Sequence, residues 1–363
     1  MTPLDVVVCG LTISSSWGNG HATTYRSLLR ELAARGHRVR FLERDVPWYA
    51  DSRDEPSPEG VELLLYPGLG ELRDAHTELV ADADVVIVGS YVPDGVEVAE
   101  WVLETAQGVV AFYDIDTPVT VSRLDRGDRE YLSPELVSRF DLYLSFSGGP
   151  VLRRLEDGYG ARRAVALYCS VDPGAYAPRP DAQEGLLGYL GTYSADRQPA
   201  LERLLLAPAR ALSAERFTVA GPLYPEAIDW PANVRRVEHV EPARHAAFYA
   251  ASRYTLNVTR ADMRRAGWSP SVRLFEAAAC GAPIISDSWR GLEELFTPGR
   301  EILLADDTTE ALRHLTGTSE EERIAIAARA RARVLAEHTA ARRAEQLEEQ
   351  LARTLGDRRT AAR

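Results

Sequence analysis

The chain has 363 residues, of which 45% are hydrophobic and 26% are charged, and these ordinary globular values exclude a disordered or fibrous protein. The length predicts two domains rather than one. The formal net charge of −12 argues against a protein that binds nucleic acid through a basic face.

The first half of the chain alternates short apolar runs with helical patterns, which is typical of a parallel sheet covered by helices on both faces. A helix is predicted over 22–35, ending at Gly36. Strands are predicted over 4–9, 39–42, 61–66, 85–88, 109–113 and 142–146. The N-terminal domain is therefore predicted to be a doubly wound, Rossmann-like unit over residues 1–172.

Residues 173–184 contain proline, glycine and acidic residues without periodicity and are predicted to be a linker. The alternation restarts beyond them, which predicts a second Rossmann-like domain over 185–318 and a helical segment over 319–363. Strands are predicted over 186–190, 217–220, 234–237, 254–258, 284–286 and 302–304, and helices over 199–212 and 272–279. Because open α/β sheets bind ligands at the carboxyl ends of their strands, the expected site is a cleft between the two domains.

The loop after the first strand carries Trp17, Gly18, Gly20 and His21. Glycines let a ligand approach the backbone, and the start of the next helix favours an anion. The segment is not a GxGxxG fingerprint, so a dinucleotide cofactor is not expected. His21 is interpreted either as a hydrogen-bonded residue at the helix start or as an acceptor contact or general base.

Two acidic residues, Asp114 and Asp116, follow the predicted strand at 109–113. They match the short DxD pattern of metal-dependent glycosyltransferases, and they could also bind sugar hydroxyls. Turn and helix-start chemistry ahead of Pro118 is the alternative interpretation. No metal ligand is assigned to this pair.

The second half carries two further loops between a strand and a helix. The first contains Thr192 and Arg197. The second, residues 259–277, is rich in arginine and leads into a helix, so it predicts a diphosphate site. Glu276 is interpreted either as a ribose ligand or as the partner of an arginine one turn away. The residues of the second loop that are singled out are Arg260, Arg264, Ser271, Val272, Arg273 and Glu276.

Several segments together resemble the CgeB-type spore maturation proteins and, more distantly, the family-4 retaining glycosyltransferases of the GT-B fold. The segments are 114–120, 144–150, 168–173, 224–225, 238–240, 255–260 and 269–281. The resemblance implies that Glu276 holds the ribose and that Arg197, with Arg260, Arg264 or Arg273, holds the diphosphate. It implies that the loop of His239 and Val240 packs against the base. A second glutamate of the relatives is replaced here by Trp268.

The resulting hypothesis is a glycosyltransferase with GT-B architecture that moves a sugar from a nucleotide sugar to an unknown acceptor, needs no metal or other cofactor, and retains the anomeric configuration. The catalytic candidates are His21, Asp116 and Arg197, and the acceptor side is assigned to Trp17, His21, Asp114 and Asp116. A sugar-nucleotide epimerase and a non-catalytic nucleotide-sugar-binding protein are the alternatives. No nucleic-acid partner is expected, and either a monomer or a homodimer fits.

The three cysteines, Cys9, Cys169 and Cys280, are widely spaced and do not form a metal or disulfide motif. The N-terminus lacks a basic region followed by a long apolar run, and the longest apolar runs are too short to cross a bilayer. The sequence therefore predicts a cytoplasmic protein without an integral membrane segment.

Overall fold

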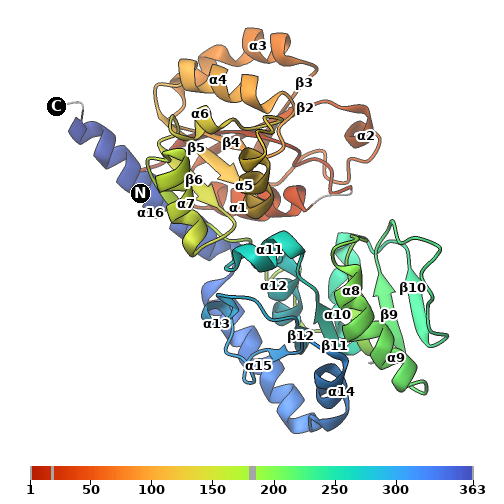
Figure 1. The fold of residues 1–363 in the computed structure, drawn as a ribbon. Helices are drawn as coiled ribbons and strands as arrows, with labels where there is room; N and C mark the ends of the chain where they lie inside the picture. The colour runs from red at the N-terminus through yellow and green to blue at the C-terminus, as the bar shows by residue number, and fades with distance from the viewer. Residues whose placement is uncertain (1, 18–19, 180–184, 362–363) are drawn as a thin grey trace. The chain divides into compact units, whose positions relative to one another are not determined.

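The computed structural model describes residues 2–17, 20–179 and 185–361. The chain divides into two compact units, Met1–Cys169 with Ala340–Arg363, and Ser170–Thr339 (Figure 1). Each unit is a parallel sheet with flanking helices, which confirms the predicted α/β fold class. The division differs from the expected boundaries, because residues 170–179 belong to the second unit and the C-terminal helical segment is shared between the units.

The first unit contains a sheet of seven parallel strands in the order β3-β2-β1-β4-β5-β6-β7. The order changes direction between β1 and β4, so the carboxyl ends of these two strands form the switch point at which such sheets bind ligands. The strands are β1 (Asp5–Gly10), β2 (Arg38–Arg44), β3 (Val61–Tyr66), β4 (Val85–Gly89), β5 (Val109–Asp114), β6 (Leu142–Ser145) and β7 (Ala164–Ala166). β4 and β5 are buried along their whole length, as strands covered on both faces should be.

The helices of the first unit connect these strands and cover the sheet. They are α1 (His21–Ala34), α2 (Pro47–Ala50), α3 (Leu69–Asp82), α4 (Gly95–Thr105), α5 (Thr117–Asp125), α6 (Pro134–Val137), α7 (Pro150–Tyr159) and α16 (Ala340–Ala361). The prediction missed β7, because its three residues Ala-Val-Ala are too few to show a period.

Helix α16 is the last helix of the chain and packs against α1 of the first unit. The carboxylate of Glu348 accepts hydrogen bonds from Arg35 at 2.8 Å and lies 2.7 Å from Nε2 of His37. Arg343 donates to the backbone carbonyl of Tyr168 at 2.9 Å. These contacts explain why the last helix joins the unit formed by the start of the chain.

The second unit contains a sheet of six parallel strands in the order β10-β9-β8-β11-β12-β13. The strands are β8 (Gly185–Leu190), β9 (Phe217–Ala220), β10 (Val234–Val237), β11 (Ser252–Asn257), β12 (Ile284–Ser286) and β13 (Leu303–Leu304). The helices are α8 (Gln198–Leu201), a π-helical turn (Glu202–Leu206), α9 (Ala207–Ala211), a 3₁₀ turn (Pro242–Arg244), α10 (His245–Ala250), α11 (Ala261–Ala266), α12 (Val272–Ala279), α13 (Leu292–Leu295), α14 (Thr308–Gly317) and α15 (Glu320–Glu337).

Helix α12 runs through the core of the second unit, and seven of its eight residues are buried. Phe275 of α12 stacks on His338, with ring centroids 4.6 Å apart. Arg331 of α15 donates to the backbone carbonyl of Ala279 at 3.1 Å, at the end of α12. The helix that follows the arginine-rich loop is therefore held rigidly.

Among the helices of the described residues, none combines the length and the apolar character needed to cross a membrane.

Candidate functional site

The loop after β1 is tied down by two carboxylates. Glu43, at the end of β2, is fully buried and accepts hydrogen bonds from the backbone N–H groups of Ile13 at 2.7 Å and Ser14 at 3.0 Å. Asp54 accepts from the backbone N–H and the hydroxyl of Ser16, both at 2.8 Å. These N–H groups are therefore already occupied, and the carboxylates beside them oppose the binding of a phosphate here.

Beyond this segment, Trp17 exposes 60% of its surface. Gly20 is the residue before α1, and its carbonyl accepts hydrogen bonds from the hydroxyls of Thr23 and Thr24, both at 3.1 Å. Gly18 lies outside the described residues. The expected ligand contact of this loop therefore depends on Trp17, Gly20 and the first residue of α1.

His21, Tyr91 and Asp116 form a connected group at the switch point of the first sheet. His21 is the first residue of α1, and its ring meets that of Tyr91 edge-on at 5.5 Å. The hydroxyl of Tyr91 donates to Asp116 at 3.1 Å. Tyr91 follows β4 and has a φ of +63°, which is a strained backbone conformation for a bulky residue. Strained backbone conformations of this kind cluster at functional sites. Burial lowers the pKa of His21 to about 4, so its ring is neutral near pH 7.

The two aspartates of the DxD pattern have different environments. Asp114 is fully buried, and its carboxylate accepts hydrogen bonds from the hydroxyls of Tyr143 at 2.6 Å and Thr120 at 2.7 Å. Burial raises the pKa of Asp114 to about 6. Asp116 is half-buried, and its backbone carbonyl accepts from the first turn of α5, so the predicted helix-start role is filled by its main chain. Of the pair, Asp116 is the residue whose carboxylate remains accessible. Within the described residues, no group of three or more His, Cys, Asp or Glu side chains is arranged to hold a metal.

In the second unit, Arg273 of α12 is buried at the carboxyl end of β8. It donates to the backbone carbonyl of Leu190 at 2.6 Å and to Oδ1 of Asn257 at 3.0 Å. Its guanidinium lies over the ring of Tyr189, 4.9 Å from the ring centroid. A Cβ atom at Gly191 would lie 2.8 Å from Nη2 of Arg273 and 2.8 Å from the hydroxyl of Tyr189, so a larger residue there would displace one of these side chains.

Arg197 is positioned beside Arg273. It donates through Nη2 to the backbone carbonyl of Thr192 at 2.8 Å, while its buried Nε has no hydrogen-bond partner among the described residues. Burial lowers the pKa of Arg197, and the positive charges of Arg273 and Arg260 lower it further. A buried donor left unpaired among neighbouring cations is costly, so this arrangement favours an anionic ligand.

Arg264, by contrast, faces acidic residues. Its guanidinium lies 3.8 Å from the carboxylate of Asp287 and 3.6 Å from that of Asp306. Its charge is therefore largely balanced within the protein. Of the three possible companions of Arg197, the structure brings Arg273 and Arg260 close to it.

Ser271, Val272 and Glu276 belong to the start and middle of α12. The hydroxyl of Ser271 donates to Oδ1 of Asn257 at 2.8 Å, which leaves it uninvolved in capping the helix. Val272 is the first residue of α12, where backbone N–H groups lack intrahelical acceptors. Glu276 is buried and accepts a hydrogen bond from Tyr249 at 2.9 Å, whereas no ion pair with Arg273 occurs in the part of the chain that is described.

Trp268, at the position where the resemblance implies a second glutamate, lies between α11 and α12. It has a φ of +45° and follows Gly267 at +70°, so the chain makes an unusual turn just before α12. The indole N–H donates to the carboxylate of Glu294 at 2.8 Å, and the ring packs so closely on Gly291 that a Cβ there would lie 2.4 Å away. The tryptophan is therefore a packing residue between this turn and α13.

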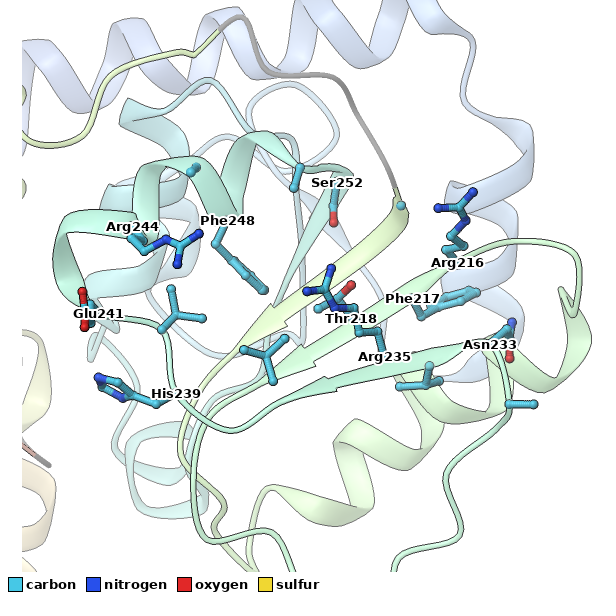
Figure 2. A pocket seen from close by; sticks show the side chains of 17 residues that line it. Arg216, Phe217, Thr218, Asn233, Arg235, His239, Glu241, Arg244, Phe248 and Ser252 are labelled. Carbon is cyan, nitrogen blue, oxygen red and sulfur yellow. The ribbon is translucent and has the colours of Figure 1, made fainter.

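His239 and Val240 follow β10 and line one end of a cavity of about 580 Å³ (Figure 2). None of Thr192, Arg197, Arg273 and Glu276 lines this cavity.

Sequence reasoning did not single out Asn257, which joins Ser271 to Arg273, or Tyr249, which holds Glu276. Asn257 ends a strand and Tyr249 lies on a short helix, and nothing in the sequence around them indicates which side chains they contact. Their roles become visible only from the hydrogen bonds that they form in the structure.

The comparisons with known proteins agree with this geometry. Residues 197–349 match the Glycosyl transferase-like family model. This domain contains Arg197, Arg273 and Glu276 and spans most of the second unit. No curated protein matches the chain.

Solved structures with the same fold cover nearly the whole chain. Sucrose-phosphate synthase from Thermosynechococcus elongatus is 15% identical with a TM-score of 0.69, covering 97% of this chain and 99% of that one. HepE of Anabaena, solved with UDP-glucose, is 15% identical with a TM-score of 0.70, covering 96% and 99%. The catalytic domain of starch synthase IV from Arabidopsis thaliana, bound to ADP and acarbose, is 12% identical with a TM-score of 0.68, covering 98% and 100%. The chain therefore has the GT-B fold, and the predicted class of glycosyltransferase is supported by the fold and the family match together.

Proposed function

We propose that this protein is a glycosyltransferase whose second unit binds a nucleotide-sugar donor. The observation that carries the proposal is the convergence of Arg197, Arg260 and Arg273, with one buried guanidinium N–H left unpaired. Two or more arginines ahead of a helix N-terminus are suited to a diphosphate, because each planar fork can engage two phosphate oxygens. The solved relatives HepE and starch synthase IV, with UDP-glucose and ADP respectively, support the same class of donor.

The ribose of the donor would lie against Glu276. Tyr249 donates to Oε2 of this carboxylate and so orients it, and Oε1 is the atom we assign to a ribose hydroxyl. His239 and Val240 would pack against the base. As the bond from the sugar to the diphosphate lengthens, negative charge develops on the leaving phosphate, and the arginines stabilise that charge where it appears.

The first unit would hold the acceptor through His21, Asp116 and Trp17. Because its ring is neutral near pH 7, His21 can accept a hydrogen bond from an acceptor hydroxyl. We propose retention of configuration without a metal, since the arginines supply the positive charge that a metal would otherwise provide. We also propose that the protein works in the cytoplasm and belongs with the CgeB-type proteins, which rests on the 269–281 segment.

The test is a thermal-shift screen against UDP-, GDP-, dTDP- and ADP-sugars, followed by calorimetry with the best nucleotide. We expect one nucleotide to raise the melting temperature of the protein, and Arg197→Gln to abolish that shift while the circular dichroism spectrum is unchanged. Equal binding of that nucleotide by the wild-type protein and the variant would contradict the proposed donor site. The anomeric configuration of the product, read by NMR, tests retention, and activity after treatment with a chelator tests metal independence.

A further inference from the structure

The cavity of about 580 Å³ in the second unit lies along one face of the sheet, over β9 and β10 (Figure 2). Thr218 and Arg235 are paired neighbours on these strands, and both line it. Phe248 and Arg244 line it from the opposite, helical side. The cavity has a size typical of sites for small molecules.

The face is open because the connection from β10 to β11 is short. It consists of one 3₁₀ turn and the six residues of α10, which is too little helix to cover the edge strands of a sheet. A parallel sheet normally presents apolar side chains to its covering helices. The polar residues Thr218 and Arg235 on this face therefore indicate a surface adapted to something other than a helix.

Three arginines border the cavity and have no side-chain partner among the described residues. Arg216, Arg235 and Arg244 form no hydrogen bond or ion pair through their side chains within the described residues. Among the described lining residues, Glu241 is the one acid beside these three arginines, so positive charge prevails in this part of the lining, in a chain whose formal net charge is −12. Unpaired guanidiniums gathered around a concave surface favour an anion, above all a phosphate.

Other residues in the lining suit a ligand that carries hydroxyl groups in addition to the phosphate. The hydroxyls of Thr218 and Ser252 make no hydrogen bond to any described residue, and Ser252 is 5% exposed. Phe248 offers a ring face of the kind on which sugars pack. Arg197 and Arg273, the proposed diphosphate ligands, are not part of this surface.

We propose that this cavity is a second binding site, for a small hydroxylated phosphomonoester such as a sugar phosphate. It adjoins the proposed donor site at His239 and Val240, which line the cavity, but does not include the diphosphate ligands Arg197 and Arg273. Arg235 and Arg244 bind the phosphate group, and Thr218 and Ser252 bind the hydroxyls of the ligand. The proposal extends beyond the transfer reaction, because it gives the second unit a ligand that is neither donor nor acceptor.

The experiment is calorimetric titration of the full chain with glucose 6-phosphate, with neutral glucose as the matched ligand. We expect glucose 6-phosphate to bind and glucose to bind much more weakly. The double variant Arg235→Gln/Arg244→Gln should lower the affinity for glucose 6-phosphate by roughly tenfold or more, since two charge-assisted contacts are lost. Both residues are exposed, so the variant should keep its fold.

Two controls separate this site from other arginines. Arg313→Gln removes an exposed arginine of α14 and should leave binding of glucose 6-phosphate unchanged. Arg197→Gln removes a donor-site arginine and should also leave it unchanged, even if it abolishes nucleotide binding. Absence of glucose 6-phosphate binding to the wild-type protein, equal binding by the double variant, or loss of binding in Arg197→Gln would each overturn the second site. The last outcome would place the probe at the donor arginines and leave the proposed function intact.

Discussion

The carboxyl edges of the two sheets differ in the charged side chains that hold their loop backbones. In the first unit, carboxylates accept from N–H groups, as Glu43 does from Ile13 and Ser14. In the second unit, carboxylates also accept from loop N–H groups, as Asp287 does from Thr259. Here guanidiniums donate to carbonyls as well, as Arg197 does to Thr192 and Arg273 does to Leu190. We therefore propose that this type of sheet edge binds a neutral, hydroxyl-rich ligand in the first unit and an anion in the second.

The largest effect on activity is expected from replacing an arginine at the carboxyl edge of the second sheet, called the basic edge below. Arg273→Gln should lower kcat by roughly 10²–10³-fold, because a preorganised donor to the leaving phosphate is lost. The matched control is Arg264→Gln, since Arg264 is balanced by Asp287 and Asp306 and should change kcat by less than about threefold. Steady-state rates with the donor found in the thermal-shift screen measure both. Equal losses in the two variants would show that general basicity, and not the position of Arg273, matters.

The next largest effect on activity is expected from substitutions at the carboxyl edge of the first sheet. His21→Ala and Asp116→Asn should lower kcat/KM for the acceptor by roughly tenfold to a hundredfold, because each removes a polar contact with the acceptor. Donor affinity, measured by calorimetry, should stay unchanged in both variants. If donor affinity fell instead, the assignment of the acceptor to the first unit would be wrong.

A smaller effect separates the ribose contact from the diphosphate contact. Glu276→Gln should weaken binding of the nucleoside diphosphate by about tenfold, because a charged hydrogen bond to the ribose is lost. Inorganic pyrophosphate lacks the ribose and should bind the variant and the wild-type protein equally. A parallel loss for pyrophosphate would mean that Glu276 acts by positioning the arginines.

The last expected effect is on stability and not on activity or binding, and here one buried aspartate of each unit behaves alike. Burial raises the pKa of Asp114 and of Asp287 to about 6. Because a raised carboxyl pKa means that the folded state holds the proton longer than the unfolded state, stability should fall as the pH rises from about 4 to about 6. Asp114→Asn should remove part of this slope, on the order of 2 kcal/mol, in urea unfolding measured at both pH values. An unchanged slope would show that Asp114 does not titrate in this range.

The strands were predictable because apolar runs of four to six residues between loop signals are their direct signature. The basic edge was predictable for the same reason, since the arginines cluster in one loop between a strand and a helix. The role of each arginine was not predictable. Arg264 and Arg273 both belong to the segment expected to be one loop, but the structure places Arg264 in α11 and Arg273 in α12. Their partners also differ: Asp287 and Asp306 for Arg264, and Asn257 for Arg273.

The sequence also did not predict which unit the last helix, α16, packs against. An Ala-, Arg- and Glu-rich helix has a face that fits many surfaces, and the choice of α1 depends on ion pairs such as Arg35 with Glu348, which are more than 300 residues apart. Likewise, the loop after β1 resembles a ligand loop in sequence, but Glu43 and Asp54 already occupy its N–H groups.

The return of α16 to the first unit makes the second unit an uninterrupted insertion, since residues 170–339 leave and rejoin the first unit's chain. The unit that carries the proposed diphosphate-binding arginines is thus one continuous stretch of polypeptide, whereas the other unit consists of two separate stretches of sequence. Removing residues from the C-terminal end of the chain would therefore damage the first unit before the second, although most of the first unit comes from the start of the sequence.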